Sequence, residues 1–448
     1  MYSRISCRGT VSLGVADVPS RLREAFNWLL KPAQELPQQQ SGGRLSLRNL
    51  FVYLGPSLIV SMAYMDPGNY GTDIQSGASF AYDLLWTVWL ANLMAMILQY
   101  LSGKLGIATG KDLPQLIKSS LKKPRFIIPY WLAAEAAAAA TDLAEYLGTV
   151  IALNILFGIP LIYAAVFGAL DVIILLALTS ERFRIIEYFF MLFVAIIGTG
   201  FLYQVILIRP SLSSIVYHSV AVSVNSQTIL LIVGIVGATV MPHALFVHSW
   251  LTKNKLTTAS MEEKRRLRRL HVREVILTLT IASLVNAAIL VCSAAAFNPQ
   301  YNGVSTINQA YSILQPLYGY LAATVFAITL LASGLASSTT GTLAGQAIMD
   351  GLIGTHVNKY ARRLVTRVIN VFPTSLAILI GLDPLHLLVY SQVILSLMIP
   401  LPMIPLIIYT QRKSLMTEFV NRRITTLLGV LSAATIIALN IYLLITTL

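Results

Sequence analysis

Charged residues are scarce in this chain, and the scarcity excludes most classes of soluble protein. Asp, Glu, Lys and Arg make up 11% of the 448 residues, whereas a soluble globular domain carries about 25%. Hydrophobic residues make up 56% and gather in long apolar runs separated by short polar stretches. A helix needs about 20 apolar residues to cross a bilayer. The sequence therefore predicts an all-α, polytopic membrane protein.

Cysteine is almost absent as well. Cys7 lies in a polar N-terminal segment and Cys292 in an apolar run. The two residues form no spaced metal motif, and a disulfide framework is implausible.

Motifs of the common enzyme classes are missing. His243 and His248 are five residues apart with no Glu between them, so they do not fit the H-E-x-x-H pattern of zinc proteases. No nucleophile elbow, P-loop or dinucleotide fingerprint occurs in a suitable strand–turn–helix context. We therefore expect a protein that is not an enzyme and has no bound cofactor.

Positive charge is abundant, and its distribution predicts how the chain crosses the membrane. The net charge is +13, but the 32 Lys and Arg residues form no single patch, which argues against a nucleic-acid partner. We count eleven apolar spans at 51–78, 83–103, 125–151, 159–179, 183–208, 227–251, 274–297, 312–350, 362–381, 386–409 and 424–447.

The basic residues fall almost entirely on one side of these spans. Seven lie in the first 50 residues, 24 follow even-numbered spans, and only Arg209 follows an odd-numbered one. Because Lys and Arg concentrate in cytoplasmic loops, we expect a cytoplasmic N-terminus and an extracellular C-terminus. The segment 22–30 is either a short interfacial helix or part of a disordered tail.

Two spans are interrupted in the middle. The first span has Asp-Pro-Gly-Asn at its centre, with Pro67 and Gly68, and the sixth has Met-Pro-His, with Pro242. Pro removes a backbone donor and breaks the helix. Backbone without partners is tolerated at membrane depth only where it lines a cavity or an ion site. Two broken spans, five spans apart, are typical of an inverted repeat with a binding site at the midplane.

This pattern divides the chain. We expect a cytoplasmic tail (1–50), a first five-helix repeat (51–208), an external loop (209–226), a second five-helix repeat (227–409), and a final loop with the last span (410–448).

Residues at the two breaks are candidate metal ligands. Asp66 is an acid near the bilayer centre, where an ionised side chain is costly and by default functional. Asn69 can add an amide oxygen, Met241 a thioether, and Ala238 a carbonyl freed by the break. Ca²⁺ and Mg²⁺ prefer oxygen ligands alone, whereas Mn²⁺, Fe²⁺ and heavier divalent ions accept sulfur. Met241 taken alone would be read as an ordinary packing residue, but its place beside a helix break and opposite Asp66 favours a ligand.

The third span carries acidic residues that suit proton transfer. Glu135, Asp142 and Glu145 lie near one helical face and must face the bundle interior, a cation or water. Arg367 in the ninth span is the expected partner, and a purely structural buried ion pair is the alternative. His243 and His248 flank the sixth-span break, and a histidine titrates near neutral pH unless burial or a neighbouring charge shifts its pKa. They serve either as proton acceptors or as hydrogen-bonding packing residues.

These blocks resemble the Nramp family of proton-coupled divalent metal transporters. The resemblance rests on DPGN and MPH at the breaks and on blocks at 84–113, 140–148, 337–346 and 391–396. It implies the LeuT-type fold, with two inverted five-helix repeats and an eleventh helix. It also implies that Asp66, Asn69, Met241 and the Ala238 carbonyl bind the metal, and that Gln392 approaches the ion in one conformation.

The same resemblance assigns a proton route. It implies that Asp142, Glu145 and Arg367 conduct protons, and that Glu135 and His243 are polar residues near the site. Two positions depart from the family pattern. Ala244 stands where MPHN usually has Asn, and Leu335 stands where SGQSST usually has Gln. Both departures put the strength of proton coupling in question more than the class of metal.

We therefore expect a cell-membrane symporter that imports Mn²⁺ or Fe²⁺ with protons. Its partners would be divalent metal ions, protons and the lipid bilayer, with no nucleic acid and no obligate protein partner. A Mg²⁺-transporting relative with weak proton coupling is one alternative, less favoured because Met241 is present. A Na⁺-coupled transporter of a small organic solute is another, although Asp66 would repel a substrate carboxylate.

Overall fold

The computed structural model of the chain describes residues 56–168, 183–254, 260–298, 300–301, 307–354, 365, 371–372 and 374–447. All regular elements within these ranges are helices, as the sequence predicts. Those of the first half are α3 (Pro56–Ala63), α4 (Pro67–Phe80), α5 (Leu85–Thr109), α6 (Leu113–Leu121), α7 (Pro124–Phe157), α8 (Leu161–Gly168) and α10 (Phe183–Ile208).

The second half continues the same architecture. Its helices are α11 (Leu212–His218), α12 (Ile229–Val240), α13 (Pro242–Asn254), α14 (Met261–Phe297), α15 (Ile307–Tyr318), α16 (Tyr320–Ile348), the π-helix η2 (Met349–Ile353), α18 (Pro384–Met398), α19 (Pro400–Gln411), α20 (Lys413–Met416), the 3₁₀ turn η3 (Thr417–Phe419) and α21 (Arg423–Thr447). Eight stretches within the described ranges are long and apolar enough to cross a membrane.

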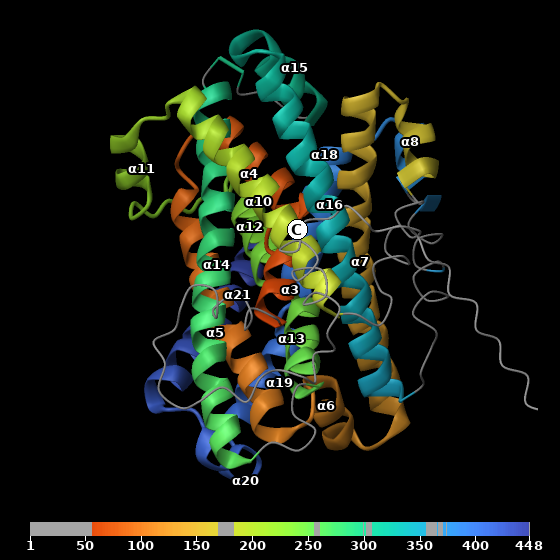
Figure 1. Cartoon of the computed structure of the whole chain (residues 1–448), viewed down its shortest axis with the longest axis vertical. Coiled ribbons are helices and arrows are strands. Elements are labelled where there is room, and N and C mark those ends of the chain that lie inside the picture. The colour runs from red at the N-terminus through yellow and green to blue at the C-terminus, as the bar shows by residue number, and fades with distance from the viewer. Residues whose placement is uncertain are drawn as a thin grey trace, which may run out of the picture.

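Both predicted breaks are present. The first span consists of α3 and α4, and the sixth consists of α12 and α13. These four short helices lie in the middle of the bundle, with α5, α7, α14 and α16 around them (Figure 1). Helix α7 packs along α16, α14 along α4, and α12 along α18. The broken helices are therefore enclosed by continuous ones, which is where irregular backbone can exist within a membrane.

Other predicted spans differ from the structure at their ends. The eighth span, expected at 312–350, begins inside α15, because Gly319 with a φ of 90° separates α15 from α16. The tenth, expected as one helix at 386–409, is formed by α18 and α19, which meet at Ile399 and Pro400. The segments 169–182 and 355–364 lie outside the described residues, so the count of eleven spans stays a prediction.

The short connecting helices lie at the two ends of the bundle. Helices α6 and α20 lie at one end, and α11 and α15 lie at the other (Figure 1). The segment with α6 follows the predicted second span and α20 follows the tenth, whereas α11 follows the fifth. The arrangement therefore places loops of even and odd number at opposite ends. The long α14 starts at Met261, thirteen residues before the predicted seventh span, with the Ser260–Glu263 capping box at its N-terminus.

Candidate functional site: a buried cluster at the two helix breaks

The first break forms because Asp66 begins a new helix. Asp66 has extended backbone angles, φ −81° and ψ 166°, and its Oδ1 accepts a hydrogen bond from the Asn69 amide N–H at 2.9 Å. Pro67 follows at the first helical position, where a missing N–H costs nothing. Asp66 is therefore the N-cap of α4, and its carboxylate lies at the positive end of that helix.

The second break frees one particular carbonyl. In a continuous helix the carbonyl of Ala238 would accept from the N–H of residue 242, but Pro242 has none. The carbonyl accepts instead from the side-chain amide of Asn69, with 3.1 Å between Nδ2 and O. Met241 stands between α12 and α13 with a φ of 36°, in the left-handed region. The two breaks thus meet through Asn69 and Ala238.

Side chains of the surrounding helices bind other carbonyls at the first break. Asn286 of α14 donates from Nδ2 to the carbonyl of Tyr64 at 2.9 Å, and Ser333 of α16 donates to the carbonyl of Met65. Backbone groups left without partners at membrane depth would cost several kcal/mol each. The break is therefore stabilised by neighbouring helices, and the sequence analysis did not single out Asn286 or Ser333.

Asn69 connects the oxygen atoms of the cluster. Its Nδ2 donates to Asp66 Oδ1 at 2.7 Å and to Ala238 O. Its Oδ1 accepts from Thr239 Oγ1 at 3.1 Å and from Asn286 Nδ2 at 3.2 Å. All five residues are fully buried. The amide hydrogens of Asn69 thus point at the two oxygens that a cation would bind. For its own oxygen to bind the same cation, the Asn69 amide must rotate.

Gln392 of α18 completes one side of the cluster. A Cβ placed on Gly68 would lie 2.2 Å from Gln392 Nε2 and 2.8 Å from Asp66 Oδ2, so a larger residue at position 68 would force one of these side chains to shift. Asp66 Oδ2 and Gln392 Oε1 are buried and have no hydrogen-bond partner among the described residues. Two buried oxygens without donors are the arrangement that a bound cation would satisfy.

The cluster is not a conventional metal site. Within the described ranges, no group of three or more His, Cys, Asp or Glu side chains could hold a metal ion. The ligands here are one carboxylate, neutral amide and carbonyl oxygens, and the buried Met241 at the break. Such a set would offer a divalent cation a single compensating charge, which suits an ion that must also leave.

The acidic residues of α7 have different surroundings. Asp142 and Glu145 are buried, and a Cβ on Gly341 of α16 would lie 2.7 Å from Glu145 Oε2. Glu135 is half-buried and accepts from Trp131 Nε1 at 3.2 Å. The predicted partner, Arg367, lies outside the described residues.

The two histidines contact different helices. Thr141 Oγ1 lies 3.0 Å from His243 Nδ1, next to Asp142 on α7. His243 Nε2 has no hydrogen-bond partner among the described residues. His243 therefore links the sixth span to the acidic face of α7.

His248 belongs to a second buried network. Its Nδ1 lies 2.7 Å from Gln99 Oε1, and Gln99 donates to the hydroxyl of Tyr64 at 2.6 Å. Its Nε2 lies 3.4 Å from Ser57 Oγ, and its ring packs edge-on against His271. This network joins the first break to α5 and α14. The sequence analysis did not single out Gln99 or His271.

Asp73 is a further acid that the sequence analysis missed. It lies seven residues after Asp66, two turns along the same face of α4, and it is fully buried. Neither carboxylate oxygen has a hydrogen-bond partner within the described part of the chain. The spacing of seven between two acids in an interrupted span was the available signal.

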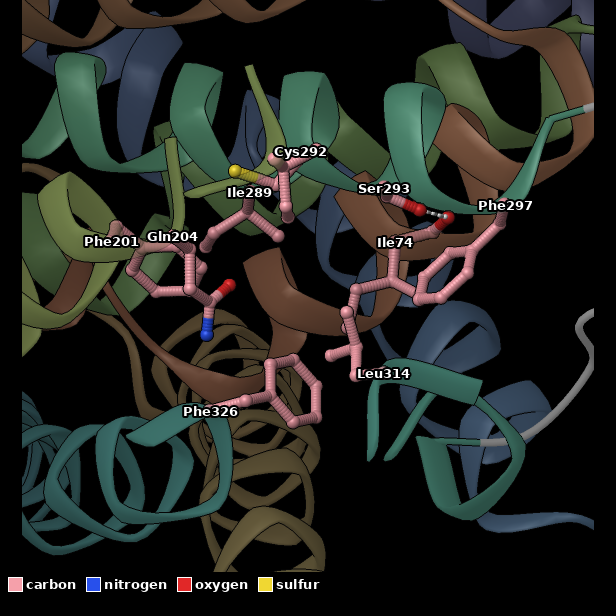
Figure 2. A pocket seen from close by; sticks show the side chains of 10 residues that line it. Ile74, Phe201, Gln204, Ile289, Cys292, Ser293, Phe297, Leu314 and Phe326 are labelled. Atoms are coloured by element: carbon pink, nitrogen blue, oxygen red, sulfur yellow. Dashed lines mark hydrogen bonds between the residues drawn. The ribbon is translucent and has the colours of Figure 1, made fainter. Parts of the chain in front are cut away.

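A pocket beside α4 has a different character from the cluster. It is lined mainly by apolar side chains of α4, α10, α14, α15 and α16, together with Gln204, Cys292 and Ser293. Figure 2 shows the Gln204 amide among aromatic and aliphatic side chains, and Ser293 donating to the carbonyl of Ile74 at 2.6 Å. None of the predicted metal ligands lines this pocket.

Comparison with known proteins gives one consistent family. Residues 57–446 match the family described as natural resistance-associated macrophage protein-like, Nramp. The chain is 42% identical to the divalent metal cation transporter MntH of Deinococcus radiodurans over 405 residues, 90% of this chain and 92% of that protein. It is 43% identical to the MntH of Granulibacter bethesdensis over 396 residues, 88% of each chain.

Solved structures agree with the sequence matches. The crystal structure of the Eremococcus coleocola manganese transporter, in complex with an aromatic bis-isothiourea substituted compound, superposes with a TM-score of 0.80. The two chains are 33% identical, and the match covers 91% of this chain and 88% of the other. The inward-facing structure of Mhp1 matches with a TM-score of 0.52 at 13% identity, which supports the shared fold alone.

Proposed function

This chain belongs to the Nramp family, and from that premise we propose that it is a secondary transporter that imports Mn²⁺ or Fe²⁺ together with protons. The LeuT-type fold supplies the means, because half-helices around a central site can open it to each side of the membrane in turn. Relatives that match along nine-tenths of the chain are named as divalent metal and manganese transporters.

The observation that carries the proposal is the buried cluster at the two breaks. Asp66 Oδ2 and Gln392 Oε1 lack hydrogen-bond donors among the residues that the structure describes, and the Asn69 amide points its hydrogens at Asp66 and Ala238, where a cation would bind. A divalent ion entering between these groups would replace the amide hydrogens and satisfy the free oxygens. The metal is the substrate, and it binds where the helices break.

The chemistry of the donor set favours transition metals. Met241 at the break would supply a thioether, which Mn²⁺ and Fe²⁺ accept and which gives Ca²⁺ and Mg²⁺ no advantage. The buried oxygens also exclude an organic carboxylate substrate, because Asp66 would repel it. Mg²⁺ transport is the second candidate function. It is less favoured because Met241 is present.

Proton movement is assigned to the face between α7 and α13. His243 contacts Thr141, and the buried acids Asp142 and Glu145 follow on the same helix. This arrangement supports a route from the metal cluster along α7, and the family relationship is consistent with proton coupling. Ala244 is buried beside His243 and has no polar side chain, so we propose that this departure affects coupling.

We also propose the orientation and the repeat boundaries. The N-terminus lies in the cytoplasm and the C-terminus outside, with repeats at 51–208 and 227–409. The supporting observations are the basic residues in even-numbered loops and the positions of α6 and α20 opposite α11 (Figure 1). Metal ions, protons and the surrounding lipid are the partners that this function requires.

The test uses purified full-length protein in liposomes that contain a pH-sensitive dye. Mn²⁺ added outside under an inside-negative potential should enter and acidify the interior. The Asp66→Asn variant keeps an N-cap for α4, because Asn caps helices as well as Asp does, but it removes the only carboxylate of the cluster. We expect its Mn²⁺ uptake to fall about 100-fold or more, since losing one partner of a buried charge pair costs several kcal/mol.

Asp383→Asn is the matched control. Asp383 caps α18 by accepting from the Leu385 N–H at 2.7 Å, and it lies outside the cluster, so uptake should stay at the wild-type rate. If Asp66→Asn transports as well as Asp383→Asn does, Asp66 is only a helix cap and the proposed site is wrong. If Mn²⁺ enters without acidification, the metal site holds and the proton coupling is wrong.

A further inference from the structure

A large crevice lies away from the metal cluster, between α5, α14 and the segment that joins η3 to α21. Its volume is about 1080 Å³. Its lining changes character along its length, from apolar side chains at one end to basic side chains at the other. Neither the metal cluster nor the acidic face of α7 contributes to it.

Five basic side chains gather at one end of the crevice. They are Lys104, Arg268, Arg269, Arg273 and Arg422. Glu418 is the only acid in the lining, and Arg265 already binds it through two hydrogen bonds of 2.8 and 2.6 Å. The basic end therefore carries a strong excess of positive charge. Glu418 does not neutralise this charge, because it is already paired with Arg265.

Contacts with neighbouring side chains hold part of the basic end in place. Lys104 is 2% exposed, donates a hydrogen bond to Asn421 Oδ1, and lies 5.0 Å from the centre of the Tyr100 ring. Arg268 lies 5.6 Å from the centre of the Phe419 ring. These contacts hold the side chains of Lys104 and Arg268 at the floor of the crevice, while Arg273 and Arg422 are exposed at its mouth.

The other end of the crevice is apolar on both flanking helices. On α5, Leu93, Met96 and Ile97 share a face with Lys104, and on α14, Val272 and Ile276 share a face with Arg268. Leu93 is 54% exposed and Ile276 53%. Leu93 and Lys104 are eleven residues apart, about 16 Å along a helix.

The order of the residues along α5 and α14 shows which end of the crevice is basic and which is apolar. Helix α5 runs toward its basic end, and α14 begins at its own basic end, so the two basic ends coincide. They lie next to the loops that carry most of the Lys and Arg, which are cytoplasmic by the charge distribution. The crevice thus passes from the cytoplasmic interface into the hydrocarbon region.

We propose that this crevice binds an anionic phospholipid of the cytoplasmic leaflet. The phosphate of the headgroup would lie among the arginines, whose planar donors match phosphate oxygens. One acyl chain would lie along the apolar faces of α5 and α14. Basic pockets between transmembrane helices on the cytoplasmic side are suited to such lipids. The positive charge of the basic end favours an anionic headgroup, and the apolar faces of α5 and α14 favour an acyl chain over a free anion.

The test is a lipid titration of the purified full-length protein, followed by native mass spectrometry. The probes are phosphatidylglycerol and phosphatidylcholine with identical acyl chains, and the apparent Kd comes from the fraction carrying one lipid. We expect phosphatidylglycerol to bind about tenfold more tightly. Arg268→Gln with Arg273→Gln should lower the affinity for phosphatidylglycerol about fivefold to tenfold, because basic residues near an anionic headgroup strengthen its binding, and should leave the affinity for phosphatidylcholine unchanged.

A matched charge control separates this crevice from general surface charge. Lys123 and Arg125 are exposed at the start of α7 and do not line the crevice. Lys123→Gln with Arg125→Gln should leave the Kd for phosphatidylglycerol unchanged, and an equal loss in both pairs would overturn the proposal. If the first pair aggregates, Arg269→Gln with Arg422→Gln serves instead, since both side chains are exposed.

A second arm distinguishes a lipid from a free anion. Ile276→Trp fills the apolar part of the crevice without changing its charge, so it should weaken phosphatidylglycerol binding about tenfold. Inorganic phosphate is titrated as the competing probe. If phosphate displaces phosphatidylglycerol at millimolar concentration and Ile276→Trp has no effect, the crevice is an anion site only and the lipid proposal fails. Equal affinity for both lipids would overturn it as well.

Discussion

Asp66 combines two roles that are usually separate. Its Oδ1 caps α4 through the Asn69 N–H, and its Oδ2 has no hydrogen-bond partner in the part of the chain that the structure describes. A cap alone would need only one oxygen, and a neutral Ser or Asn would serve as well. The negative charge is therefore not explained by the helix end. We propose a divalent cation as its partner, because the ion would use the free oxygen and offset the cost of burying the charge.

We propose that Met241 sets which cations the cluster accepts. We expect Met241→Ala to keep some Mn²⁺ uptake and to raise the apparent KM for Mn²⁺ by roughly tenfold, since a borderline metal loses its soft ligand. Ca²⁺ should compete better in the variant than in the wild type, because the remaining ligands are all oxygens. Competition of Ca²⁺ and Cd²⁺ against Mn²⁺ uptake in liposomes measures both changes.

Met403→Ala is the control for lost packing at Met241. Met403 is also fully buried, but it lies in α19 and belongs to neither break. Its replacement should leave the order of metal preference unchanged. If Met241→Ala alters neither affinity nor selectivity relative to Met403→Ala, the soft-ligand argument is wrong.

Local chemistry explains which cluster residues could be predicted. Pro67 and Pro242 remove particular N–H groups, so Asp66, Asn69 and the Ala238 carbonyl follow from the sequence alone. Thr239, Asn286 and Asp73 were missed because their roles depend on how each helix is rotated about its axis. Hydropathy does not report that rotation for a span that is buried on all sides.

At the scale of elements, the approach of α12 to α18 determines where Gln392 lies. A Cβ on Gly237 would lie 1.8 Å from the backbone oxygen of Gln392, and backbone cannot move aside as a flexible side chain can. Gly237→Ala should therefore push the helices apart and destabilise the protein by about 1–3 kcal/mol. Thermal unfolding in detergent, followed by helical circular dichroism, measures this change.

Gly198 offers a matched control within α10. No atom lies within 4 Å of a Cβ at Gly198, so Gly198→Ala should leave stability unchanged or raise it by up to about 1 kcal/mol through better helix propensity. Gly237→Ala should also lower Mn²⁺ uptake, because Ala238 and Gln392 both belong to the cluster. Equal melting temperatures for the two variants would show that α12 and α18 can separate without cost.

Some helix boundaries could not be predicted from sequence patterns. The breaks at Asp66 and Met241 were predictable because Pro lies within an apolar run. The boundary at Gly319 was not, because both flanks are apolar and a glycine with positive φ leaves no change in hydropathy. The junction of α18 and α19 escaped for a different reason. Pro400 is the first residue of a helix, where its missing N–H is tolerated.

At the scale of the whole molecule, orientation links the function to the lipid crevice. The distribution of basic residues predicts that even-numbered loops are cytoplasmic, and α20 lies at the opposite end from α11 (Figure 1). Metal import and binding to the cytoplasmic leaflet both depend on this direction. The fold alone does not determine it, since an inverted repeat has nearly the same architecture either way up.

Single cysteines labelled from outside the cell test this orientation. In a background with Cys7→Ser and Cys292→Ser, we introduce Ser213→Cys in α11 or Ser414→Cys in α20, both at exposed positions. A membrane-impermeant maleimide should label Ser213→Cys in intact cells, and Ser414→Cys only after permeabilisation. The opposite pattern would place the basic loops outside, so the crevice between α5 and α14 would face the outer leaflet. The anionic-lipid proposal would then lose its membrane context, while the metal cluster, which lies between the two ends, would stand.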